Sequence, residues 1–156
     1  MKKLILVFAT VAFTTIGVKA QDSRPTTLSI GVNVGIPSSG YSIAYGADLQ
    51  ADFAVAATTK ITGSIGYENF KFKDIDVHNY YVPLLIGAKF NLGSDKLYGH
   101  AQLGYAFGKD HNGAFAYAPS IGYYFSPNLD ASVKYLAFSK NGGTLSDIGL
   151  RLAYNF

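Results

Sequence analysis

The chain has 156 residues, which is enough for one domain and too few for two of ordinary size. Thirteen Lys and Arg residues stand against ten Asp and Glu residues, but the three additional basic residues, Lys2, Lys3 and Lys19, precede every acidic residue. The chain after position 20 is therefore formally neutral, and its charge gives no reason to expect a nucleic acid partner. The sequence contains no cysteine, which excludes a disulfide framework and a thiolate metal site.

The first twenty residues differ in character from the rest. Lys2 and Lys3 precede an apolar run over residues 4–18, and Ala20 ends the stretch. A charged start, a short apolar run and a small final residue are typical of a secretory signal peptide. A membrane-spanning helix is the alternative, but it requires roughly 20 apolar residues. We therefore predict two parts, a cleaved signal peptide (1–20) and one mature domain (21–156).

Apolar residues alternate with small or polar residues along most of the chain after Thr26. Such alternation predicts strands with two unlike faces. The 17 glycines and 12 tyrosines also disfavour helices. Eight strands are predicted, at residues 27–36, 44–55, 61–69, 80–92, 97–107, 114–125, 129–138 and 145–156.

The two faces of these strands suggest a membrane protein. A soluble barrel turns its large apolar side chains inward and covers its outside with Lys and Glu. Here the face opposite the large apolar residues carries mostly Gly, Ala, Ser, Asn and Gln. Small residues suit the interior of an eight-stranded barrel, and large apolar residues suit contact with lipid. We predict an all-β fold, an eight-stranded antiparallel up-and-down transmembrane β-barrel.

Aromatic residues lie near the ends of the predicted strands, as in the interfacial girdles of membrane proteins. Examples are Tyr80, Phe90, Phe107, Tyr117, Phe125, Tyr154 and Phe156. The connections divide into tight turns at 57–60, 93–96 and 126–128, and mostly longer loops at 37–42, 70–79, 108–113 and 139–144. Tight periplasmic turns and longer outer loops are typical of bacterial outer-membrane barrels. Two irregularities are expected, a bulge at 136–138 and a lost hydrogen-bond donor at Pro83.

The C-terminal segment LRLAYNF ends in Phe156, with Leu150, Leu152 and Tyr154 alternating before it. This segment, GHAQLGYAFG and FAYAPSIGYYF together resemble the small outer-membrane β-barrel proteins of OmpA/OmpX type. The resemblance covers about residues 26–156. It implies that the four alternating C-terminal residues form the signal presented to the barrel-assembly machinery. It says little about activity, because barrels of this size serve as adhesion factors, structural anchors and lipid enzymes.

The inward-facing polar residues are the candidate functional residues. Burying an unpaired charge is expensive, so we expect Asp48 or Asp52 to pair with Lys89, Lys134 or Arg151. Side chains about fill the interior of an eight-stranded barrel, so such a network would plug the lumen. The predicted network consists of Asp48, Asp52, Glu68, Lys89, Gln102, Lys134 and Arg151, with Gln50, Ser64, His100 and Asp130 on the same face.

Enzymatic chemistry has weak support in the sequence. A lipid-modifying barrel enzyme needs a serine nucleophile, a histidine and an orienting carboxylate. His78, His100 and His111 lie in no serine-centred motif, so no catalytic residue and no cofactor are predicted.

Metal binding has equally weak support. Asp74, Asp76 and His78 alternate in one loop and could hold a divalent cation or contact cation-bridged surface sugars. A solvated loop is the commoner meaning of such a segment, and no metal site is predicted. Lys71 and Lys73, just before it, could meet lipid phosphates.

The sequence thus favours a non-enzymatic outer-membrane barrel with a structural or surface-interaction role and a lumen plugged by polar side chains. A narrow pore for small solutes and a lipid-modifying enzyme are the alternatives. The expected partners are outer-membrane lipid, the assembly machinery and an unidentified ligand of the outer loops. We expect a monomer.

Overall fold

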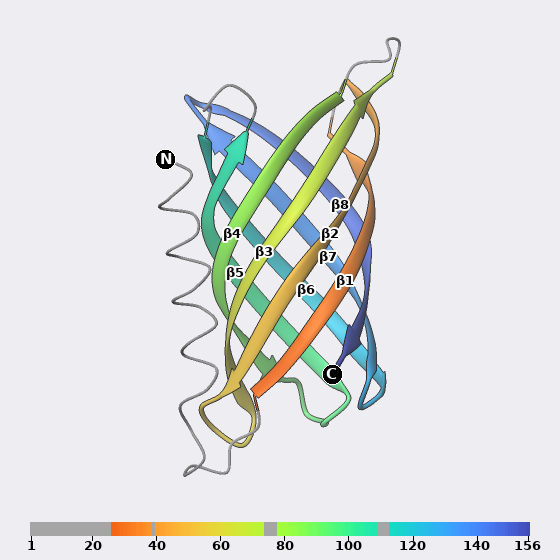
Figure 1. The fold of residues 1–156 in the computed structure, drawn as a ribbon, viewed down its shortest axis with the longest axis vertical. Helices are drawn as coiled ribbons and strands as arrows, with labels where there is room; N and C mark the ends of the chain where they lie inside the picture. The colour runs from red at the N-terminus through yellow and green to blue at the C-terminus, as the bar shows by residue number, and fades with distance from the viewer. Residues whose placement is uncertain (1–25, 39, 74–77, 109–112) are drawn as a thin grey trace.

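The computed structural model describes residues 26–38, 40–73, 78–108 and 113–156, which form one closed antiparallel barrel (Figure 1). Each strand pairs with the next one in the chain, and β8 closes onto β1. The predicted fold class is confirmed. The strands are β1 (Thr26–Pro37), β2 (Tyr41–Ala54), β3 (Thr59–Phe72), β4 (His78–Asn91), β5 (Leu97–Gly108), β6 (Gly113–Ser126), β7 (Leu129–Lys140) and β8 (Gly143–Asn155).

The described ranges contain no helix long and apolar enough to cross a membrane. The predicted signal peptide lies outside the described residues. We call the end at which β1 begins and β8 ends the terminal end, and the opposite end the distal end.

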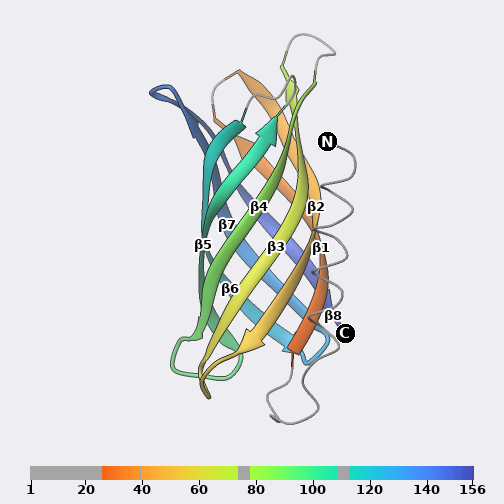
Figure 2. The ribbon, with the colours of Figure 1, turned by 60° about the vertical axis from the view of Figure 1, so that its left-hand side comes forward.

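The strands are staggered as well as closed. Followed from Thr26 across all eight strands, the pairing returns to β1 at Ile36, ten positions further along. This stagger tilts the strands steeply around the barrel, as Figures 1 and 2 show. Strand number and stagger together fix the width of a barrel, and eight strands leave an interior that side chains can fill.

The register places the large apolar side chains on the outside. In β8, Leu150 and Leu152 are 60% and 49% exposed, whereas Arg151 and Ala153 between them are buried. The strands β1, β2 and β6 show the same alternation over most of their length. The predicted assignment of the two faces is confirmed.

The outer surface has aromatic residues towards both ends and mainly aliphatic residues between them. In β4, Tyr80 lies near the distal end, Leu84 and Ile86 in the middle and Phe90 near the terminal end, and all four are exposed. Six exposed aromatic residues lie towards the terminal end: Phe53, Phe90, Tyr123, Phe125, Tyr154 and Phe156. Seven lie towards the distal end: Tyr45, Tyr67, Tyr80, Tyr105, Phe107, Phe115 and Tyr135.

The predicted contrast between tight turns and longer loops is wrong. Between strand bounds, the connections comprise 55–58, 92–96 and 127–128 at the terminal end, and 38–40, 73–77, 109–112 and 141–142 at the distal end. The strands continue into residues that were expected to form loops, because their side chains keep alternating and their backbones keep pairing. Lys140 pairs with Gly143, for example, and leaves only Asn141 and Gly142 in the turn.

The bulge predicted at residues 136–138 is also wrong. The register of β7 with β8 is unbroken from Leu129 to Lys140. The pattern looked irregular because the inward side of β7 changes from polar Lys134 to apolar Leu136 and Phe138. Register shifts occur instead between Tyr124 and Ser126, and between Tyr41 and Ile43.

The irregularity expected at Pro83 is present as an interruption of one ladder. Gly66 and Tyr67 of β3 lie opposite Val82 and Pro83 of β4, and the pairing of the two strands skips these positions. Proline has no backbone N–H to donate there.

The β7–β8 turn provides a test of the hairpin geometry. Asn141 and Gly142 have φ of 49° and 81°, the combination of a type I′ turn. We expect Gly142→Ala to lower the free energy of unfolding by about 1 kcal/mol, because a side chain is strained at positive φ. Urea unfolding in detergent micelles, followed by circular dichroism, measures this loss.

Gly63→Ala is the matched control. An added Cβ at Gly63 of β3 meets no atom within 4 Å, and the backbone there is extended. This variant should be as stable as the wild type or slightly more so. Equal losses in the two variants would contradict the turn geometry.

Candidate functional site

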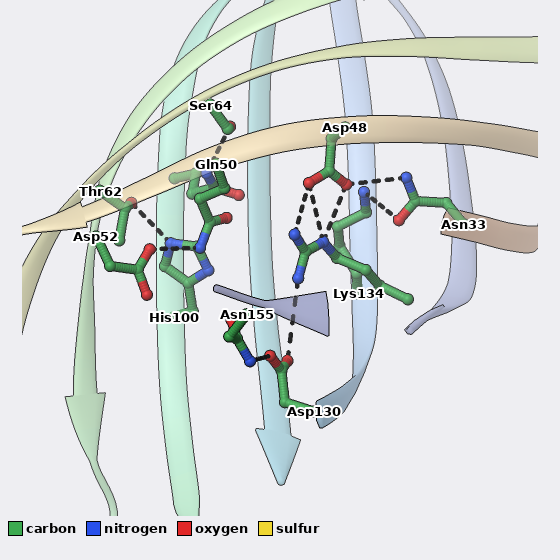
Figure 3. A network of polar contacts seen from close by, with 12 residues as sticks. Asn33, Asp48, Gln50, Asp52, Thr62, Ser64, His100, Asp130, Lys134 and Asn155 are labelled. Carbon is green, nitrogen blue, oxygen red and sulfur yellow. Dashed lines mark hydrogen bonds and ion pairs between the residues drawn. The ribbon is translucent and has the colours of Figure 1, made fainter. Parts of the chain in front are cut away.

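Side chains from all eight strands fill the lumen, which is the candidate functional site. A polar network occupies its terminal and central parts, and an apolar cluster occupies its distal part. Figure 3 shows the polar network from close by.

The centre of the network is an ion pair between Asp48 of β2 and Arg151 of β8. Arg151 Nη2 lies 2.6 Å from Asp48 Oδ1, and Nε donates to Oδ2 at 2.9 Å. Such two-pronged contacts are among the strongest charge-assisted hydrogen bonds. Asn33 Nδ2 also donates to Asp48 (3.1 Å), and Lys134 Nζ donates to Asn33 Oδ1 (3.0 Å).

A second ion pair lies nearer the terminal end. Lys89 Nζ lies 2.8 Å from Asp52 Oδ2, and both side chains are buried. Gln50 Nε2 donates to the other oxygen of Asp52 at 2.7 Å. Lys89 also donates to the hydroxyl of Tyr124 (3.3 Å) and lies 4.7 Å from the ring centre of Tyr98. These contacts replace much of the hydration that the two charges lose on burial.

Asp130 of β7 connects the two ion pairs. Its carboxylate accepts hydrogen bonds from the Tyr98 hydroxyl (2.5 Å) and from Asn155 Nδ2 (2.9 Å). Arg151 Nη1 lies 3.9 Å away. Asp130 is fully buried, so these donors take the place of water.

The structure brings six of the seven predicted network residues into polar contacts. Asp48 pairs with Arg151, and Asp52 pairs with Lys89. Lys134 donates to Asn33, and Gln102 donates to Ser64 at 2.9 Å. Glu68 lies apart from these contacts. Among the described residues, its Oε1 has no hydrogen-bond partner, and the same is true of Asp147 Oδ1. Asp147 was not predicted as a network residue, although it shares the inward face of β8 with Arg151.

The distal part of the lumen is apolar, so the expectation of a wholly polar plug is wrong there. The Tyr81 and Phe138 rings stack with centres 4.5 Å apart, and Phe70 meets both edge-on. Leu136 and small wall residues such as Ala44 pack against them. Sequence reasoning missed this cluster because Phe70 was placed in a loop and Phe138 in an irregular segment. If the inward and outward alternation is continued from Glu68 along β3 and from Lys134 along β7, it predicts that Phe70 and Phe138 face inward.

A cavity of about 20 Å³ remains below the apolar cluster. Its lining includes Asn33, Asp48, Glu68, Lys134 and Leu136. This volume holds roughly one water-sized body. The lumen in this structure is therefore packed and contains no wide passage through the described residues.

Both histidines of the described residues, His78 and His100, lie against neutral polar side chains. His100 Nε2 lies 2.8 Å from Thr62 Oγ1, and both side chains are buried in the lumen, away from lipid. His78 Nδ1 lies 2.8 Å from Asn69 Oδ1 at the distal end. His111, Asp74 and Asp76 lie outside the described residues. Within the described part of the chain, no group of three or more His, Asp or Glu residues could hold a metal ion.

The residues proposed as an assembly signal all face outward, three in the terminal half of β8 and the fourth directly after it. They are Leu150, Leu152, Tyr154 and Phe156, and Phe156 is 74% exposed.

Lys71 lies at the distal end of β3 and Lys73 directly after it, and both are exposed. Contact of these lysines with lipid phosphates stays a prediction.

Comparisons with known proteins support the fold and no closer relationship. No family model matches the sequence, and no curated protein matches it. The N-terminal β-barrel domain of Pseudomonas aeruginosa OprF is similar at 14% identity with a TM-score of 0.65, over 86% of this chain and 100% of that one. Ail, the attachment invasion locus protein of Yersinia pestis, is similar at 16% identity with a TM-score of 0.61, over 84% and 97%.

The outer membrane enzyme PagL is similar as well. Its identity is 17% and its TM-score 0.59, over 80% of this chain and 97% of that one. At such identities, the shared feature is the barrel fold. Proteins with and without enzymatic activity use it, so the likeness does not assign a role.

The Asp48–Arg151 pair allows a test of how the network contributes to stability. Arg151→Met leaves Asp48 and Asp130 without their shared cation in the lumen. We expect the free energy of unfolding to fall by about 3–5 kcal/mol, because a buried charge then lacks its partner. The double variant D48N/R151M removes both charges and should recover part of the loss. Urea unfolding of D48N, R151M and D48N/R151M measures the coupling free energy between Asp48 and Arg151.

Lys96→Met is the control for loss of a basic residue, because Lys96 lies exposed in the β4–β5 connection. Its effect should stay within about 0.5 kcal/mol. A loss in R151M no larger than in K96M would show that the ion pair does not stabilise the barrel.

Proposed function

We propose that the protein is a non-enzymatic outer-membrane β-barrel with a structural or surface-interaction role and a closed lumen. The observation that carries this proposal is the outer surface. Thirty-three large hydrophobic side chains of the described residues are exposed, among them Ile86 at 64% and Leu150 at 60%. An apolar surface on this scale is costly in water and favourable in lipid.

The backbone arrangement supports the same conclusion. In hydrocarbon every backbone polar group needs a protein partner, and a closed barrel provides one for each strand without leaving an edge. The two regions of aromatic residues match the places where a membrane meets water, and the aliphatic residues between them match its core.

Export and assembly complete the proposal. Residues 1–20 would direct secretion and be removed, and the barrel would insert from the periplasm. The terminal end would then face the periplasm and the distal end the outside of the cell. The outward row of β8 that ends in Phe156 would be recognised by the barrel-assembly machinery.

A role in surface interaction would use the distal turns, because these are the parts of the barrel that a partner outside the cell can reach. In Figure 2 the β7–β8 hairpin extends away from the barrel wall at this end. Ail, a protein named for attachment and invasion, has the same kind of barrel. Only the fold supports extending that role to this chain.

The two alternatives have less support. A pore needs a continuous passage, but ion pairs and an aromatic cluster fill this lumen. A lipid-modifying enzyme, like the outer membrane enzyme PagL, needs reactive groups that lipid can reach. His100 is buried and shares its hydrogen bond with a threonine inside the barrel. Loss of phospholipid turnover in H100A or H78A cells would favour the enzyme.

Cell fractionation tests the proposed location and assembly together. We expect the protein in the outer membrane, with an unboiled band on a denaturing gel that migrates differently from the boiled one, because a closed barrel resists detergent until it is heated. A periplasmic protein without such a shift would contradict the proposal.

Phe156→Ala should reduce the amount of folded band in cells while leaving the stability of the purified, refolded barrel nearly unchanged. Phe125→Ala is the matched control, since Phe125 is 61% exposed among the aromatic residues of the same end. Equal losses of folded protein in the two variants would remove the assembly signal from the proposal.

Planar bilayer recordings test the closed lumen. We expect the wild-type protein to show no stable, wide conductance, because the ion pairs and the aromatic cluster block the interior. A steady conductance from a homogeneous preparation would instead favour the pore.

A further inference from the structure

Two buried carboxylates lie just below the distal apolar cluster. Glu68 precedes Phe70 by two positions on the inward face of β3, and Asp147 of β8 pairs with Leu136 of β7. Their side chains are only 2% and 4% exposed. Both acids therefore lie at the level where the filling of the lumen changes from polar to apolar.

The two carboxylates lean towards each other. The strands between them are β1 and β2, which carry glycine at the positions concerned. A Cβ added to Gly46 would lie 2.6 Å from Glu68 Oε2, and one added to Gly35 would lie 2.5 Å from Asp147 Oδ2. Each carboxylate thus occupies the space above a glycine of the intervening strand, where any larger side chain would displace it.

Each acid also keeps one oxygen without a hydrogen-bond partner among the described residues, Oε1 of Glu68 and Oδ1 of Asp147. Buried polar atoms of this kind are rare in folded proteins, and a bound water or ion commonly explains them. Two such atoms on acids that face each other point to a shared ligand.

The charges around the pair indicate what the ligand must supply. Lys134 is the basic group that acts electrostatically on both acids, and its ammonium donates to Asn33. Asp48, the other acid close to Glu68, is held by Arg151. Arg151 is shared by Asp48 and Asp130. The four acids Asp48, Glu68, Asp130 and Asp147 therefore exceed the two bases Lys134 and Arg151 by two negative charges. An uncompensated charge is expensive in a desolvated interior.

We propose that Glu68 and Asp147 form a binding site for one small metal cation inside the barrel. Carboxylate oxygens are the ligands that hard cations such as Mg²⁺ and Ca²⁺ prefer, and Na⁺ also binds oxygen ligands. An excess of two negative charges accommodates a monovalent or a divalent ion. The cavity of about 20 Å³ beside Glu68 has room for a water ligand. A water alone could donate hydrogen bonds but would leave the charge in place.

Refolding the protein into detergent micelles in different salts tests this site, because the ion then need not cross the packed lumen. The probes are NaCl, CaCl₂ and choline chloride at equal ionic strength, since choline is too large for the cavity. We expect Na⁺ or Ca²⁺ to raise the folded-to-unfolded ratio about tenfold over choline when the ion is at ten times its dissociation constant. Comparison of the two metal arms identifies the charge of the ion.

Variants assign the effect to the two acids. E68Q and D147N should each lose the preference for metal salts, and in choline they should be at least as stable as the wild type, because one repelling charge is gone. Asp95→Asn is the matched control, since Asp95 lies exposed in the β4–β5 connection and D95N should keep the salt preference.

Three outcomes would overturn the site. Equal stability of the wild type in all three salts would show that no metal cation binds to Glu68 and Asp147, and that only water or a proton does. A salt preference that persists in E68Q and D147N would place the cation elsewhere. A preference that D95N also loses would reflect general surface charge.

Discussion

Closure of the strand ladder is the constraint on which the rest of this structure depends. Eight strands with a stagger of ten residues form a complete ring of backbone hydrogen bonds. The ring leaves no free edge, which allows the outer face to be apolar throughout. It also fixes a narrow lumen, so every inward side chain must find its partners among the other inward side chains.

This narrowness explains the chemistry of the interior. Small residues line much of the wall and leave room for a few large groups from other strands. Arg151 reaches Asp48, 103 positions away in the sequence, and Lys89 reaches Asp52 on another strand. Each buried charge costs solvation, so ion pairs and neutral donors such as Asn33 and Tyr98 occur together. The distal cluster of Phe70, Tyr81 and Phe138 fills its part of the lumen with rings, so no ion-pair partner is needed there.

The two faces have different tolerance to change. Outward residues meet a uniform apolar surrounding, so one aliphatic residue can replace another at little cost. Inward residues belong to a connected network in which removal of one group leaves another unsatisfied. Glu68 and Asp147 are the acids of the lumen that each keep one carboxylate oxygen without a hydrogen-bond partner among the described residues.

Alternation along the sequence was sufficient to predict the eight strands, their outward faces and most inward polar residues. It could not predict which acid meets which base, because that depends on a stagger accumulated over eight strands. Asp147 lay on the predicted inward face. That one of its oxygens lacks a hydrogen-bond partner can be seen only in the packed structure. Phe70 was missed because the charged residues that follow it suggested a loop, and Phe138 was missed because residues 136–138 suggested a bulge. The strands continue through both positions.

The most direct test of the central claim is to measure which face of the strands meets lipid. The chain has no cysteine, so single spin labels can be attached at Leu103→Cys and Ile121→Cys on the outer face of the strands, and at Asp95→Cys in the exposed β4–β5 connection. In lipid vesicles, labels at 103 and 121 should collide often with oxygen and rarely with a water-soluble nickel chelate, whereas the label at 95 should collide often with the chelate. Frequent collisions of the 103 and 121 labels with the nickel chelate would contradict a barrel whose apolar face lies in the membrane.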